Sequence, residues 1–126
     1  MATLTANGLR TPLRGHQEIA VDSCVTSFAQ GTPRVTVTMA TGTGKTLVGL
    51  NTVQETAPHG SALVVMPTLK LLEQTAAVWH KEGRRGLYLG VCSLPAPEEP
   101  DLRGVLTMVH TAEELAAQVS WAVLSE

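Results

Sequence analysis

Apolar positions along the chain follow two different spacings, and the longer spacing predicts helices. Between residues 15 and 30, Val21, Cys24, Val25 and Phe28 recur three and four positions apart, as they would on one face of an amphipathic helix. The same signals predict three more helices, over residues 45–55, residues 68–82 and the segment that begins at Thr111.

Four shorter runs have the composition of β-strands. The run VTVTM alternates β-branched residues, and SALVVM is a continuous apolar run of the kind found in strands buried on both faces. The predicted strands are residues 35–39, 61–66, 87–92 and 104–109. Because they alternate with helices long enough to cross over a sheet, the pattern predicts a three-layer α/β/α fold with a parallel sheet.

Length and composition define the class of protein more than its activity. The 126 residues suit one domain, which we place at residues 13–126 after a lead-in of residues 1–12. Cys24 and Cys92 lie in apolar segments without metal-ligand spacing, so we expect reduced, buried thiols. No apolar run is long enough to span a membrane, and the N-terminus lacks the apolar core of a secretory signal, which predicts a cytoplasmic protein.

A glycine-rich loop gives the clearest chemical signal. The sequence TGTGKT follows a predicted strand and precedes a predicted helix, the setting in which such loops bind phosphate. Glycines at 42 and 44 let backbone amides approach an anion, Lys45 supplies positive charge for the β- and γ-phosphates, and Thr46 supplies a hydroxyl for Mg²⁺. The alternative, a glycine turn with a solvated lysine, explains this setting less well.

The form of this loop and of its surroundings resembles motif I and neighbouring motifs of superfamily 2 helicases and translocases. MATGTGKT has Met39 where the strict phosphate-loop pattern has glycine. LRGHQ is similar to the glutamine-containing element upstream of motif I, LVVMPTLKLLEQT to motif Ia, and VLTMVHTAEELA to motif Ib. The resemblance spans about residues 9–119 and implies the first part of a RecA-like P-loop ATPase domain.

The resemblance also implies which residues bind nucleotide. Gln17 would recognise the adenine of ATP with Arg14 in support, and the loop would hold the triphosphate and its Mg²⁺. The implied nucleotide-binding residues are Arg14, Gln17, Thr41, Gly42, Thr43, Gly44, Lys45 and Thr46. A polar position on an amphipathic helix is the simpler alternative for Gln17.

Nucleic acid, DNA in particular, is the partner that the resemblance implies. The corresponding positions are Pro67, Thr68, Lys70 and Thr111, with Lys70 standing in for an arginine that many family members have at the position of Leu69. Thr68 and Thr111 are equally competent helix N-caps, and Thr111 with Glu114 matches a capping box. The formal net charge of −2 predicts no bulk attraction to nucleic acid. For the basic cluster KEGRRG, residues 81–86, we favour a solvated helix end over a nucleic-acid contact.

The acidic motif needed for hydrolysis does not occur in this sequence. No DExH or DEAD motif follows an apolar strand, so we expect no catalytic residue and an incomplete sheet. Two hypotheses follow. The chain is either the ATP-binding N-terminal segment of a superfamily 2 DNA helicase, or a non-catalytic remnant or interaction module that binds nucleotide weakly or not at all. An unpaired sheet edge would require either a C-terminal helicase portion or self-association.

Overall fold

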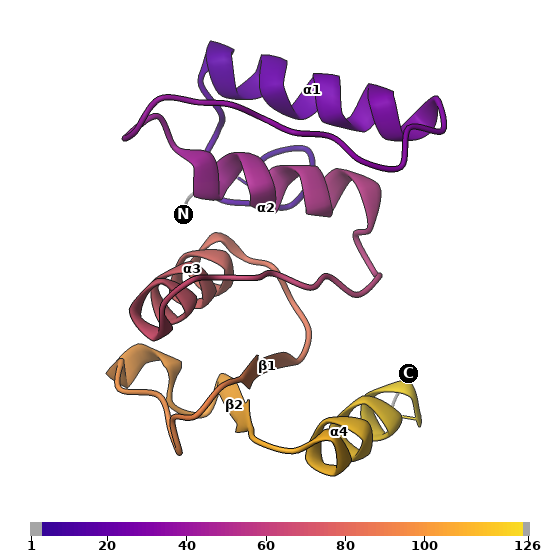
Figure 1. Cartoon of the computed structure of the whole chain (residues 1–126). Helices are drawn as coiled ribbons and strands as arrows, with labels where there is room; N and C mark the ends of the chain where they lie inside the picture. Colours follow the sequence, from indigo (N-terminus) through magenta and orange to yellow (C-terminus); the bar gives the residue numbers. More distant parts are fainter. Residues whose placement is uncertain (1–3, 125–126) are drawn as a thin grey trace. The chain divides into compact units, whose positions relative to one another are not determined.

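The computed structural model describes residues 4–124, with side chains as far as residue 119, and contains short elements joined by extended chain (Figure 1). In chain order the elements are α1 (Gly15–Ala29), α2 (Lys45–Thr56), α3 (Leu69–Glu82), β1 (Tyr88–Val91), the 3-10 turn η1 (Pro100–Leu102), β2 (Leu106–Val109) and α4 (Ala112–Leu124). They fall into two compact units: the described residues up to Val64 with Lys81–Arg84, and Val65–His80 with the described residues from Arg85 onward.

The first unit is built on the packing of α1 against α2. Both predicted helices are confirmed, and their buried apolar residues include Val21 and Cys24 on α1 and Val48 and Leu50 on α2. The prediction that Phe28 belongs to the buried face is wrong, because its side chain is 38% exposed. The buried residues of α1 lie nearer its N-terminus and include the polar Gln17.

The segment before α1 is hydrogen-bonded to α2. Leu9 is fully buried, and the Asn7 side-chain amide donates to Oδ1 of the buried Asn51 at 2.7 Å. Gln54 of α2 donates to the Asn7 carbonyl at 3.1 Å. These contacts satisfy polar groups of the lead-in, whose described residues form no helix or strand. Because no helix or strand is formed there, its sequence shows no hydrophobic periodicity.

The second unit contains the parallel strand pair. β1 and β2 run parallel in a register that pairs Tyr88 with Leu106 and Val91 with Val109, so the third and fourth predicted strands and their orientation are confirmed. The proline-rich loop between them carries one fully buried side chain, because Leu102 is only 1% exposed. Apolar packing of this one side chain ties the loop to its unit.

Two predicted strands are absent from the part of the chain that the structure describes. Residues 35–39 and 61–66 are extended but form no strand ladder. Val37 is 41% exposed and Leu63 is 89% exposed. A β-branched run becomes a strand only when neighbouring strands satisfy its amides and cover its side chains, and here neither condition is met. The α/β class is confirmed, with an incomplete sheet.

Arg84 fixes the C-terminal end of α2. Its side chain is 8% exposed and donates to the carbonyls of Ala57, Pro58 and Gly60 at 2.9, 3.3 and 2.9 Å and to Oε1 of Gln54 at 3.0 Å. A guanidinium suits this place because it presents several donors in a plane and interacts favourably with the negative end of the helix dipole. The prediction of a solvated basic cluster is therefore wrong for Arg84, while the neighbouring Arg85 is exposed.

Replacing Arg84 should destabilise the first unit. We predict that Arg84→Met lowers the free energy of unfolding by about 3 kcal/mol, since the charged hydrogen bonds of a buried guanidinium are lost while the apolar volume is largely kept. Arg85→Met is the matched control and should change it by about 0.5 kcal/mol or less. Urea unfolding followed by circular dichroism measures both, and equal midpoints for the two variants would contradict this role of Arg84.

Candidate functional site

The glycine loop, residues 41–46, reverses the chain just before α2. Gly42 has φ +78° and Gly44 has φ +87°, in the left-handed region that side chains rarely adopt. Gly44 is the N-cap of α2. The hydroxyl and the amide of Thr43 both donate to the carbonyl of Ala40, at 2.5 and 3.4 Å, which closes the turn. The two predicted glycines are thus at the two positions where the turn requires them.

This geometry leaves the N-terminus of α2 open to an anion. Gly44 has no side chain that could accept from the first-turn amides of the helix, and the Val48 amide bonds back to the Gly44 carbonyl at 3.3 Å. Lys45 and Thr46 follow at once, and both are exposed. Backbone donors, the positive end of a helix dipole, an ammonium and a hydroxyl therefore come from three consecutive residues, a set that fits a phosphate chain with its Mg²⁺.

Gln17 joins the N-terminus of α1 to this loop. Its side-chain oxygen accepts from the Arg14 amide at 2.9 Å, and its Nε2 donates to the carbonyls of Thr43 and Gly44 at 3.2 and 3.5 Å. The residue is 3% exposed. With both ends of the amide engaged, Gln17 has a fixed orientation in this conformation, between the Arg14 amide and the loop.

Gly44 is needed for this contact as well as for its backbone angle. A Cβ added at Gly44 would overlap Nε2 of Gln17, whereas one added at Gly42 would meet nothing within 4 Å. The absence of a side chain at 44 therefore lets α1 approach the loop.

The structure brings the proposed nucleotide residues together in the first unit. The exposed Arg14 is the N-cap of α1, next to the Gln17 contact, and the exposed Thr41 begins the loop. Sequence reasoning missed His16, whose Nε2 lies 3.0 Å from the carbonyl of Thr43. The only sequence signal for this contact was the position of the histidine next to Gln17 in LRGHQ. A single exposed histidine forms no periodic pattern that would indicate a role.

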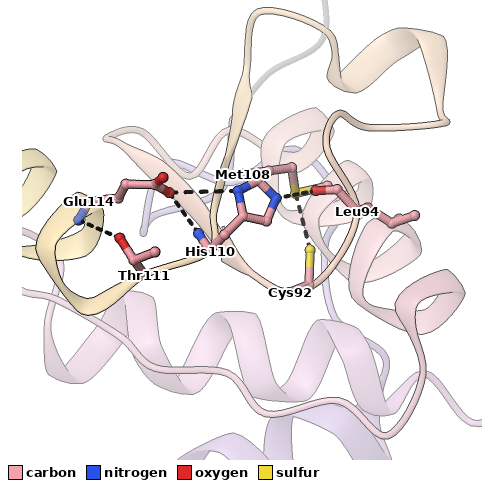
Figure 2. Close-up of polar contacts among 6 residues, drawn as sticks. All are labelled: Cys92, Leu94, Met108, His110, Thr111 and Glu114. Atoms are coloured by element: carbon pink, nitrogen blue, oxygen red, sulfur yellow. Dashed lines mark hydrogen bonds and ion pairs between the residues drawn. The ribbon is translucent and has the colours of Figure 1, made fainter.

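The candidate nucleic-acid residues lie in the second unit, and both threonines cap helices. Thr68 Oγ1 accepts from the Leu71 amide at 3.2 Å. Thr111 Oγ1 accepts from the Glu114 amide at 3.1 Å (Figure 2). The other half of the predicted capping box differs, because the Glu114 carboxylate accepts from the His110 amide at 2.8 Å and not from that of Thr111. Each hydroxyl still has a proton to donate, so capping and a phosphate contact are compatible.

His110 ties this helix start to the loop after β1. One ring nitrogen lies 2.7 Å from the carbonyl of Leu94, and the other lies 3.6 Å from the Glu114 carboxylate (Figure 2). A histidine between these two acceptors positions the start of α4 against its own unit. Thr111 is therefore held in place by residues on both sides of it.

Lys70 lies among carboxylates. With Pro67 and Thr68 it is exposed, but it shares a pocket of about 370 Å³ with Glu73, Glu98 and Glu99. Glu73 is 8% exposed and accepts from the Glu98 amide at 2.6 Å. Negative charge this close to Lys70 opposes the approach of a phosphate, so the local field here is less favourable to nucleic acid than the sequence suggested.

Two further kinds of site are absent from the described residues. None of the helices within residues 4–124 has the length and apolar character needed to cross a membrane. Over the same residues, no three histidine, cysteine or acidic side chains gather where they could hold a metal ion. Cys24 and Cys92 are free thiols, the first buried and the second half-buried.

Comparisons with known proteins agree with the resemblance read from the motifs. Residues 10–86 match the family described as type III restriction enzyme, res subunit. A 43-residue segment is 46% identical to a Saccharomyces cerevisiae protein named "Putative ATP-dependent helicase IRC3". That segment is 34% of this chain but 6% of the yeast protein. No solved structure gives a significant match.

The family match includes α1, the glycine loop, α2 and α3, which is more than half of the chain. It therefore confirms the P-loop helicase class that the motifs predicted. The chain belongs to the family described as type III restriction enzyme, res subunit.

Proposed function

We propose that this chain binds Mg-ATP through the glycine loop, as the nucleotide-binding segment of an ATP-dependent nucleic-acid motor. The observation that supports it best is the conformation at Gly44, where a left-handed N-cap without a side chain leaves the first amides of α2 facing an anion site. Membership of a helicase family makes the triphosphate of ATP the natural anion.

Each loop residue has a distinct part in this proposal. The amides of residues 42–46 donate to phosphate oxygens, and Thr41 starts the turn that presents them. Lys45 places its ammonium on the β- and γ-phosphates, while the Thr46 hydroxyl is a ligand of Mg²⁺. When bound, the metal neutralises charge between the phosphates. No group of histidine, cysteine or acidic side chains within residues 4–124 could hold a metal ion, and in this proposal Mg²⁺ arrives with the nucleotide.

Binding without hydrolysis is the activity expected of this chain. No DExH or DEAD sequence is present in its 126 residues, so no carboxylate pair is available to hold Mg²⁺ and orient water. The extended segments 35–39 and 61–66 fit the same proposal, because they form no strand pairing and expose apolar side chains that further strands would cover. A C-terminal helicase portion is the partner we propose for them, and a cytoplasmic setting remains a prediction.

Removing the loop lysine tests nucleotide binding directly. We predict that Lys45→Ala weakens binding of a fluorescent ATP analogue in Mg²⁺ by at least about tenfold, because one charge on the terminal phosphates is lost. Lys81→Ala, at another exposed lysine, is the control and should bind as the unaltered chain does.

Three outcomes would each contradict a part of this proposal. Equal binding by Lys45→Ala and the unaltered chain would show that the loop is not the nucleotide site. Failure of the unaltered chain to bind would favour the alternative of a non-catalytic interaction module. Phosphate release well above background by the purified chain would contradict the expectation of binding without hydrolysis.

Nucleic-acid binding is proposed as a weaker, second property. Pro67, Thr68, Lys70 and Thr111 are exposed, and the two threonines stand at helix N-termini that can receive a phosphate. The support is the helicase family together with these helix starts. DNA is the substrate we propose.

The salt dependence of binding tests whether Lys70 contacts a phosphate. We predict weak binding of single-stranded DNA that falls with added salt, and Lys70→Ala should reduce the slope of log affinity against log salt by about one. Fluorescence anisotropy of a labelled oligonucleotide measures the slope, with Arg103→Ala as the control at another exposed cation. The same slope in Lys70→Ala and the unaltered chain would exclude a phosphate contact by Lys70.

A further inference from the structure

We propose that His16 is a positioning residue of the phosphate loop and acts with Gln17 through the carbonyl of Thr43. This inference rests on the proposed nucleotide site and assigns a residue that the helicase motifs do not single out. It also gives Gln17 a part in phosphate binding that is separate from base recognition.

The carbonyl of Thr43 receives two side-chain donors from adjacent residues of α1. His16 Nε2 lies 3.0 Å and Gln17 Nε2 lies 3.2 Å from the Thr43 oxygen. A carbonyl only accepts, so the His16 nitrogen that faces it must carry the proton. Two donors on one oxygen use both of its lone pairs and fix the direction of the carbonyl.

The direction of this carbonyl determines where the neighbouring amide points. The Thr43 carbonyl and the Gly44 amide belong to one planar peptide, in which the oxygen and the N–H point to opposite sides. Holding the oxygen toward α1 therefore turns the Gly44 amide away from α1. In the proposed site that amide is one of the phosphate donors, so His16 and Gln17 set its orientation before the anion arrives.

The two donors differ in how firmly they are held. Gln17 is 3% exposed and is fixed by the Arg14 amide, whereas His16 is exposed and, within residues 4–124, is hydrogen-bonded only to the carbonyl of Thr43. Replacing His16 thus removes one donor without opening the buried contact between α1 and α2. His16 is the better residue for testing the role, because its replacement should leave the fold intact.

Ligands with and without a base distinguish positioning from base recognition. We measure binding of ATP, GTP and inorganic tripolyphosphate, each with Mg²⁺, to the unaltered chain, His16→Ala and His16→Gln. Positioning predicts about fivefold weaker binding of all three ligands to His16→Ala, since one hydrogen bond to the loop is lost. His16→Gln should recover much of it, because its amide can donate to the same oxygen. His59→Ala replaces another exposed histidine and should change nothing.

A loss for ATP alone would overturn the proposal, because it would place His16 at the base. Unchanged binding of all three ligands by His16→Ala would overturn it as well.

Hydrogen exchange without nucleotide separates this inference from the proposed function. Positioning predicts faster amide exchange over residues 41–47 in His16→Ala, with unaltered exchange in the second unit and an unaltered urea midpoint. If the unaltered chain binds no ligand but exchange still rises in His16→Ala, the proposed function fails while the contact with the loop is upheld. If exchange is the same in both chains, His16 does not position the loop.

Discussion

The left-handed backbone at Gly44 is the constraint on which the first unit depends. It ends the glycine loop, begins α2 and leaves room for Gln17 to reach the loop from α1. One residue without a Cβ thus meets three requirements: an allowed backbone angle, an open helix N-terminus and close packing of a neighbouring helix. The same absence that lets two protein segments meet leaves space and donors for an anion.

Helix α2 is held at both ends by polar contacts. At its start, Gln17 and His16 bond to the carbonyl of Thr43, and at its end the buried Arg84 donates to the carbonyls that follow the last turn. Between these ends, Asn51 and Gln54 of α2 form hydrogen bonds with Asn7 of the lead-in. A helix whose N-terminus binds a charged ligand must not shift when the ligand arrives, and these contacts oppose such a shift.

The helices and the glycine loop could be predicted from sequence because each depends on local signals. Lys45–Thr56 begins after a glycine whose left-handed backbone angle other residues rarely adopt, and Leu69–Glu82 begins after a threonine that caps it. The prediction of strands at residues 35–39 and 61–66 was wrong, because a strand depends on neighbouring strands that no local pattern supplies. The buried Arg84 and the contact of His16 with Thr43 were missed for the same reason: both join segments far apart in the chain.

The central claim is that the glycine loop is the nucleotide site, and amide chemical shifts test it most directly. In a titration of the ¹⁵N-labelled chain with Mg-ATP, the largest shift changes should fall on the amides of Gly42–Thr46, with smaller changes at the start of α1. Changes confined to the second unit, or none at saturating Mg-ATP, would contradict the account.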